Sequence, residues 1–237
     1  EELPFFVNTA SSVHAIDPWA VKEANLPVQE VQIPDTSGKT AKLEFVKSSF
    51  KIAERSFVES NFWVTPFSKS YAANSLACTV APQLLAEGQA FALDFFNSKF
   101  YIGQWDDLLA QTRAVELPAG SAASCHSPTH RTANWWTVKV KVDGIETKLI
   151  LASMEENTLV YKTGPASERV LTKGSTKLSH LYNADVELGG IKFKKLIDIK
   201  DHTDPDCKAD GLLGMDVLKM CVVVLSKDRL ALFCHEL

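Results

Sequence analysis

The order of short apolar segments in the first half of this 237-residue chain is repeated in the second half. In each half, an apolar strand runs into a small polar loop, a hairpin follows, and a second hairpin ends the half. The internal hairpins are expected around residues 50–57 and 186–199, and the terminal ones at residues 90–102 and 221–234. A repeat of this kind predicts two lobes built on one plan.

The segments themselves have the pattern of strands. Runs rich in Val, Phe, Thr and Leu are common, and stretches of helical period are few and short. Residues 135–142 alternate apolar and polar side chains, Asp143-Gly144 is a two-residue turn signal, and residues 145–151 return as the partner strand. We therefore predict an all-β fold with minor helices.

A polar segment separates the two halves. Residues 120–132 are small, polar and free of apolar periodicity, which predicts a linker. We accordingly expect an N-terminal lobe at residues 1–119 and a C-terminal lobe at residues 133–237.

Composition excludes several classes of function. A net charge of −4 and an isoelectric point near 5.9 leave no basic stripe for nucleic acid. No segment reaches the roughly 18 apolar residues of a membrane span, and the first residues lack a signal-peptide pattern, so any targeting peptide is expected to be absent or already removed. The five cysteines form no C-x-x-C pair. Cys125, His126 and His130 fall in the expected linker, so we expect no metal and no cofactor.

Residues 209–218, Ala-Asp-Gly-Leu-Leu-Gly-Met-Asp-Val-Leu, precede the last hairpin. This segment resembles the second signature of pepsin-like and retropepsin-like aspartic proteases, in which two hydrophobic residues and a Gly cross beneath the active-site loop. In the first half, residues 80–85 take its place, with Gln83 where that Gly is expected. The resemblance covers nearly the whole chain and implies a bilobal fold with two pseudo-twofold-related lobes. The matching positions are Gly211, Leu212, Leu213 and Gly214.

The other signature of that family is two apolar residues followed by Asp, Thr or Ser, Gly, and Ala or Ser, once in each lobe. Residues 7–16 resemble it with Asn8 in the place of the aspartate and Ala10 in the place of the glycine. Residues 150–160 resemble the second copy, with Ala152 and Met154 at those two positions. The resemblance therefore implies that both catalytic aspartates are missing.

Aspartic-protease chemistry needs one ionised carboxylate to take a proton from water and one protonated carboxyl to polarise the scissile carbonyl. Neither an amide nor a methyl group can take these roles. The nearest carboxylates are interpreted otherwise: Asp17, next to a proline, as a helix N-cap, and Glu155 and Glu156 as solvated loop residues. His14 is interpreted as a polar loop residue, because no Ser-His-Asp arrangement surrounds it.

The resemblance implies a groove floored by the two loops and covered by a flap hairpin, and residues 31–43 have the form of that flap. We expect an inactive protease-like protein that binds a protein or peptide, with no nucleic acid or membrane span, as a monomer with an internal pseudo-dimer. Two alternatives stay open: an active aspartic peptidase disabled by active-site substitution, and a structural interaction module whose groove Met154 plugs. The expected binding residues are Thr9, Ala10, Ser11, Asp35, Thr36, Ser37, Gly38, Ser153, Met154 and Glu155.

The last hairpin also predicts a disulfide. If Lys227-Asp228 is a two-residue turn, the strands pair so that Cys221 faces Cys234 in a non-hydrogen-bonded position, within disulfide reach. The alternative is a pair of buried free thiols. A disulfide would favour an extracytoplasmic location.

Overall fold

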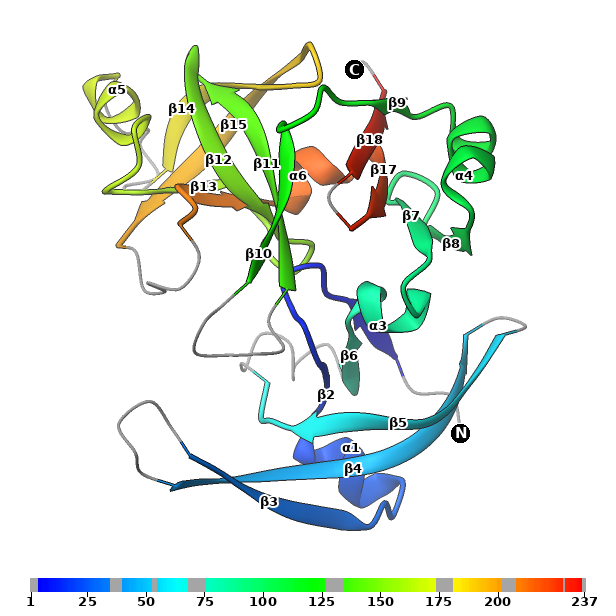
Figure 1. Cartoon of the computed structure of the whole chain (residues 1–237). Coiled ribbons are helices and arrows are strands. Elements are labelled where there is room, and N and C mark those ends of the chain that lie inside the picture. The colour runs from blue at the N-terminus through cyan, green and yellow to red at the C-terminus, as the bar shows by residue number, and fades with distance from the viewer. Residues whose placement is uncertain are drawn as a thin grey trace. The chain divides into compact units, whose positions relative to one another are not determined.

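The computed structural model describes residues 4–34, 40–52, 55–67, 76–126, 134–173, 181–201, 208–227 and 229–235. In these residues the chain is mostly β, as predicted, and the strands form three sheets (Figure 1). The chain divides into two compact units, Glu1–Leu85 and Ala86–Leu237.

The first unit holds a six-stranded sheet in the order β1-β6-β2-β5-β4-β3. Its short strand β6 is central to the group β1-β6-β2, where it pairs in parallel with β1 and antiparallel with β2. The helix α1 follows β2 and begins with a proline at its first turn, where the missing N–H costs nothing. These elements are β1 (Phe5–Val7), β2 (His14–Ile16), α1 (Pro18–Glu23), β3 (Val28–Pro34), β4 (Thr40–Ile52), β5 (Arg55–Val64) and β6 (Cys78–Val80).

The second unit holds a seven-stranded sheet in the order β10-β11-β12-β16-β13-β15-β14. Its central strand β16 pairs in parallel with β12 and antiparallel with β13. The elements are β10 (Ala122–His126), β11 (Asn134–Val142), β12 (Ile145–Leu151), β13 (Leu159–Tyr161), α5 (Ser167–Thr172), β14 (Leu181–Leu188), β15 (Ile191–Lys200), β16 (Gly211–Leu213) and α6 (Met215–Leu218).

The two sheets share one topology. The run β1-β6-β2-β5-β4 matches β12-β16-β13-β15-β14 in order, and every neighbouring pair matches in direction. Val7 pairs with Val80 in the first half, and Leu151 pairs with Leu213 at the same place in the second half. These pairs match the residues of the two halves one by one. The repeat expected from the sequence is therefore present in the strand order.

This register corrects one detail of the sequence comparison. Cys78 occupies the position of Gly211, and the residue that follows β6, Ala81, occupies the position of Gly214. The prediction that Gln83 stands in the place of a signature glycine is therefore wrong by two residues, because spacing alone could not align strands this short.

A third sheet, in the order β8-β7-β17-β18-β9, lies within the second unit. The two terminal hairpins of the repeat join in it through the antiparallel pair β7 and β17. The helix α4 packs on this sheet, around a core that includes Trp105 and Leu108. The elements are α3 (Pro82–Ala86), β7 (Ala90–Asp94), β8 (Lys99–Gly103), α4 (Trp105–Thr112), β9 (Val115–Glu116), β17 (Cys221–Ser226) and β18 (Arg229–Cys234).

The expected linker is partly regular structure. Residues 122–126 form β10, which pairs antiparallel with β11, whereas residues 127–133 lie outside the described part of the chain. The strands β7, β8 and β9 belong to the second compact unit although the predicted first lobe, 1–119, includes them. That lobe assignment stays a prediction, because it follows the repeat, whereas the compact units follow packing.

The last hairpin has the predicted register. Ser226 pairs with Arg229 and Cys221 with Cys234, and the two cysteines are joined by a disulfide with their Cα atoms 4.0 Å apart. The alternative of two free thiols does not hold for this pair.

We expect loss of this bond to lower the free energy of unfolding by up to about 3 kcal/mol, because it closes a loop with a sequence separation of 13 residues. Urea unfolding of Cys221→Ser, Cys234→Ser and the double variant measures the effect. Either single variant should cost as much as the double variant, since each breaks the same bond. Additive effects of the two substitutions would contradict a bond between these cysteines.

Candidate functional site

Each half of the repeat carries a loop that begins directly after the first strand of the shared run, β1 in one half and β12 in the other. Asn8 follows β1, and its N–H donates to the carbonyl oxygen of Val80 at 2.8 Å. Ala152 follows β12, and its N–H donates to the carbonyl oxygen of Leu213 at 3.0 Å. The two positions that the resemblance assigns to missing aspartates are thus held by the same bond to the last residue of the central strand.

The loops also turn alike. The Ser11 N–H donates to the Asn8 carbonyl at 3.3 Å, and the Glu155 N–H donates to the Ala152 carbonyl at 3.1 Å. In the first loop the Asn8 side chain takes part, because its Oδ1 accepts from the Ala10 N–H at 3.0 Å. A methyl group at position 152 offers no such acceptor.

A side chain closes each loop onto the end of its central strand. Thr158 Oγ1 accepts from the Gly214 N–H at 3.1 Å. At the corresponding place, His14 Nδ1 accepts from the Ala81 N–H at 3.1 Å. Two unlike residues therefore satisfy the same backbone donor, which leaves the imidazole proton of His14 on Nε2.

Asp216 completes the second loop and was not singled out from the sequence. Its Oδ1 accepts from the N–H and the hydroxyl of Thr158, at 2.8 and 2.7 Å. Burial raises the pKa of Asp216 above its usual range. The matching residue in the first half is Gln83, whose Nε2 donates to the carbonyl oxygen of Ser11. The sequence signal was an Asp two residues after Gly214, inside the signature itself.

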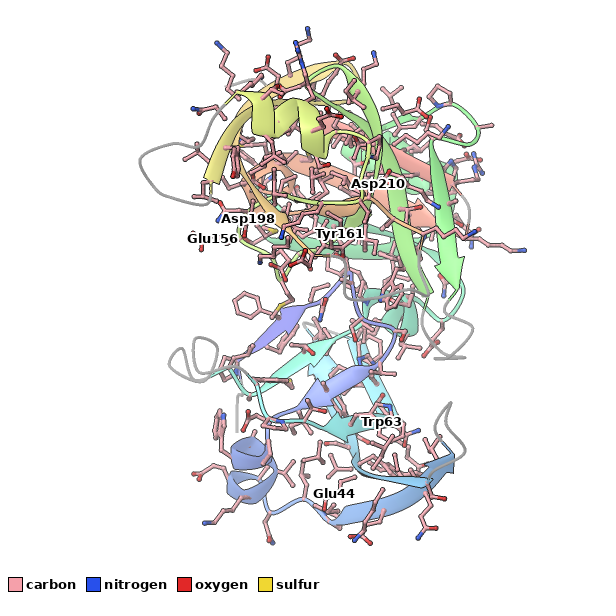
Figure 2. All side chains as sticks on the ribbon, turned by 90° about the vertical axis from the view of Figure 1, so that its left-hand side faces the viewer. Glu44, Trp63, Glu156, Tyr161, Asp198 and Asp210 are labelled. Carbon is pink, nitrogen blue, oxygen red and sulfur yellow. A yellow bond between two sulfur atoms is a disulfide. The ribbon has the colours of Figure 1, made fainter. Side chains whose placement is uncertain are left out.

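No carboxyl stands at either loop position where the chemistry would need one. Asp17 is the N-cap of α1, as predicted: its Oδ1 accepts from the Trp19 N–H at 3.0 Å, and its Oδ2 accepts from the Phe67 N–H at 2.8 Å. Both oxygens are occupied in a structural role. Glu155 is half-buried, and Glu156, labelled in Figure 2, is exposed.

His14 differs from its interpretation as a polar loop residue. It lies in β2 and is only 4% exposed, stacked on Phe62 with ring centroids 5.0 Å apart and in edge contact with Phe50 at 5.9 Å. Burial lowers the pKa of His14 to about 4. The strands β4 and β5 bring the two phenylalanines from far along the chain, which local sequence could not reveal.

The arms of the expected flap form a hairpin of β3 and β4, in which Val31 pairs with Leu43 and Ile33 with Ala41. Because side chains alternate along a strand, these residues share one face, and the opposite face carries the ion pair of Glu30 with Lys42. Ile33 is 38% exposed and Leu43 is 39% exposed. The hairpin thus presents an open apolar face and a charged face.

The base of the hairpin is anchored to the rest of the sheet. Phe45 pairs with Trp63 of β5, their ring centroids 5.9 Å apart, whereas the arms beyond Phe45 are paired only with each other. Glu44 of β4 and Trp63 of β5, labelled in Figure 2, belong to opposite faces of the sheet, because Trp63 pairs with Phe45, the residue after Glu44. The tip residues Asp35, Thr36, Ser37 and Gly38 lie outside the described residues.

The other expected binding residues differ in exposure. Thr9 is 1% exposed, so it offers almost no surface. Ala10 and Ser11 of the first loop are half-buried, as are Ser153 and Met154 of the second. Each loop therefore has side chains that are partly exposed.

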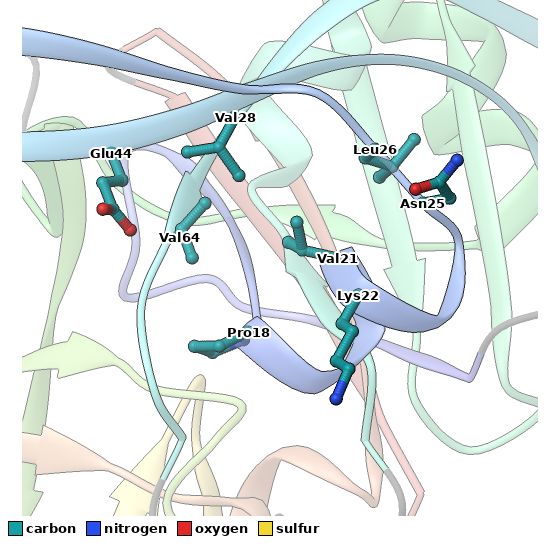
Figure 3. A pocket seen from close by; sticks show the side chains of 8 residues that line it. All are labelled: Pro18, Val21, Lys22, Asn25, Leu26, Val28, Glu44 and Val64. Carbon is teal, nitrogen blue, oxygen red and sulfur yellow. The ribbon is translucent and has the colours of Figure 1, made fainter.

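The first unit also has a pocket of about 340 Å³ at the base of the hairpin (Figure 3). Its apolar wall includes Val21 of α1, Val28 of β3 and Val64 of β5, and Glu44 stands beside them. Since Glu44 belongs to the charged face of the hairpin, this pocket lies on the side opposite the open apolar face. The eight lining residues are Pro18, Val21, Lys22, Asn25, Leu26, Val28, Glu44 and Val64.

In the described part of the chain, no three His, Cys, Asp or Glu side chains gather in a way that could hold a metal ion. Among the same residues, no helix has the length and apolar character needed to cross a membrane.

No family model matches this chain, and no curated protein matches it. Several solved structures are similar to it at low identity. One is a retropepsin-like aspartic protease from Rickettsia conorii, with 17% identity over 53% of this chain and 96% of that chain and a TM-score of 0.32. Another is the retroviral protease-like domain of Ddi1 from Leishmania major, with 16% identity over 43% of this chain and 96% of that chain and a TM-score of 0.25.

A third is conglutin gamma, a basic 7S globulin from lupine seeds, with 9% identity over 99% of this chain and 87% of that chain and a TM-score of 0.42. At these values the likeness carries no argument of its own.

Proposed function

We propose that this chain is a catalytically inactive aspartic-protease-like protein that binds an extended segment of protein or peptide. The observation that carries the proposal is the pair of equivalent loops. Both are held by the same backbone bonds, and their first residues are Asn8 and Ala152. The position that would have to supply a carboxylate in each half has an amide in one and a methyl group in the other.

The missing carboxylates remove both steps of the chemistry. An amide is not a base, and a methyl group neither accepts nor donates a proton. Loss of one general acid or base typically costs about 10²- to 10⁴-fold in rate. Asp17 is held as an N-cap and Asp216 is bonded to Thr158, so both have structural tasks. Glu155 and Glu156 lie in the second loop, three and four residues after the position where a carboxylate would be needed.

The hairpin of β3 and β4 supports binding. β3 is the edge strand of its sheet, so its backbone can pair with an added strand. Val31, Ile33 and Leu43 give one face an apolar surface for the side chains of such a segment. Strand addition supplies affinity through backbone bonds, and the apolar face supplies selectivity for alternating apolar residues.

The test is binding of a labelled library of extended peptides, measured by fluorescence anisotropy on the intact chain. Ile33→Ser and Leu43→Ser should each weaken the best peptides about tenfold, because each removes most of one buried apolar side chain from the contact. Gln32→Ser, on the charged face of the same strand, is the matched control and should leave binding unchanged. Equal effects of all three substitutions would contradict the assignment of the apolar face.

A second prediction separates the proposal from the reading as a disabled peptidase. Restoring carboxylates with Asn8→Asp and Ala152→Asp should leave peptide hydrolysis near background, because Ala10 and Met154 still replace the loop glycines, and catalytic geometry tolerates only about 0.5 Å of error. Hydrolysis is measured by mass spectrometry at acid pH. Efficient proteolysis by the restored chain would favour the disabled-peptidase alternative.

A further inference from the structure

A second pocket, of about 170 Å³, lies in the second unit, and none of its lining residues belongs to the two loops or to the hairpin of β3 and β4. It forms where the turn between β11 and β12 meets the helix α5 and the strands β14 and β15; α5 packs beside β14 (Figure 1). Four cations and three carboxylates line it. The lining residues are Lys141, Asp143, Gly144, Arg169, Lys173, Asp185, Glu187 and Lys192.

Asp143 is the most buried of these charges, with a side chain that is 2% exposed. Its Oδ1 accepts from the Asp185 N–H at 2.9 Å and from the Lys173 ammonium group. Its Oδ2 is buried and receives no hydrogen bond from any residue that the structure describes. A buried carboxylate oxygen without a donor is costly, so this atom is a ready acceptor for a ligand that brings one.

The cations of the pocket are not all neutralised. Lys141 pairs with Glu187 at 3.1 Å, and Lys173 pairs with Asp143. Arg169 and Lys192, both exposed, make no ion pair within the described ranges of the chain. Two unpaired cations beside a buried acceptor fit a small anion that also carries a hydrogen-bond donor.

We propose that this pocket binds a hydrogen-bearing phosphate, either inorganic phosphate or a phosphate monoester in its monoanionic form. Arg169 and Lys192 would contact the charged oxygens, for which a guanidinium fork is well suited. The P–OH group would donate to Asp143 Oδ2, which requires a small shift of this side chain or of its neighbours because the atom is buried in the free protein. Sulfate has the same shape but carries no proton at neutral pH, so the carboxylate should repel it rather than accept a bond from it.

The experiment is isothermal titration of the intact chain with inorganic phosphate and, separately, with sulfate at equal ionic strength. We expect phosphate to bind at least about tenfold more tightly than sulfate, because sulfate has no proton to donate to Asp143 and so lacks one charged hydrogen bond. Equal binding of the two would mean an adventitious ion only, and no binding of phosphate would overturn the site outright.

Variants distinguish the residue that selects phosphate over sulfate from the residues that attract the anion by their charge. Asp143→Asn keeps an acceptor for the Asp185 N–H and adds a donor, so it should abolish the preference for phosphate. Arg169→Ala and Lys192→Ala should each weaken phosphate about tenfold or more. Lys99→Ala on β8 removes the same charge outside the pocket and should change nothing. An unchanged preference in Asp143→Asn would contradict the proposed role of its carboxylate.

The two sources of the phosphate group can be told apart by pH. The second proton of a monoester leaves with a pKa near 6, whereas inorganic phosphate keeps a P–OH group well above neutrality. At pH 8 a glycerol phosphate should therefore bind far more weakly than inorganic phosphate if the P–OH donor is required. Equally tight binding of glycerol phosphate at pH 8 would contradict that requirement.

Discussion

Gly211→Ala is expected to destabilise the second unit by about 4 kcal/mol or more, beyond the usual cost of overpacking. A Cβ atom at this position would lie 2.1 Å from the carbonyl oxygen of Leu159 and 2.9 Å from the Cα of Val160. Both atoms belong to the backbone of β13, which is paired on its other side with β15, so neither can move cheaply. Urea unfolding followed by circular dichroism measures the loss.

Gly103→Ala on β8 is the matched control in the same unit. There the nearest atom to the added Cβ is a Leu108 side-chain carbon at 3.8 Å, an ordinary contact. We expect its stability to stay within about 1 kcal/mol of the unmodified chain. If Gly211→Ala were equally mild, β16 could not lie so close to its neighbour β13 at this position, and the assignment of the signature would fail.

Acid is expected to weaken the first unit through His14. Burial lowers the pKa of this imidazole from 6.5 to about 4 in the folded chain. Between these values the unfolded chain binds a proton that the folded chain does not. The free energy of unfolding therefore falls as the pH drops from 6.5 to 4, by about 3 kcal/mol in all, and this group causes no further loss below pH 4.

His14→Thr isolates this contribution, because the other half of the repeat already uses Thr158 for the same bond. The variant loses ring packing on Phe62 and should be less stable at pH 7. Its further loss between pH 6.5 and 4 should be about 3 kcal/mol smaller than that of the unmodified chain. The free energy of unfolding of both chains is measured with urea at each pH. An equal decline in the two chains would show that His14 does not contribute to the loss of stability in acid.

Short-range patterns carried the successful predictions. Alternation and two-residue turns predicted the β11–β12 and β14–β15 hairpins, and the same arithmetic placed Cys221 opposite Cys234. The need for Gly211 and Gly214 was visible in the signature, and the structure adds the reason, which is backbone contact within 3 Å of each added Cβ.

Features that depend on distant partners could not be predicted. His14 is buried because Phe50 and Phe62 arrive from later strands. The strand β10 lacks an apolar pattern of its own and exists through its pairing with β11. Gln83 was misplaced because a three-residue strand has no register until its neighbours are known.

Mass spectrometry of a peptide library incubated with the unmodified chain tests whether the chain binds peptides without cleaving them. The chain is incubated over the range from pH 3 to pH 7, and the bound peptides are then recovered on the immobilised protein. Because Asn8 and Ala152 leave both aspartate positions without a carboxyl, we expect bound peptides to return intact, at the background rate of hydrolysis. Cleaved peptides whose appearance is abolished by Asn8→Ala would contradict it.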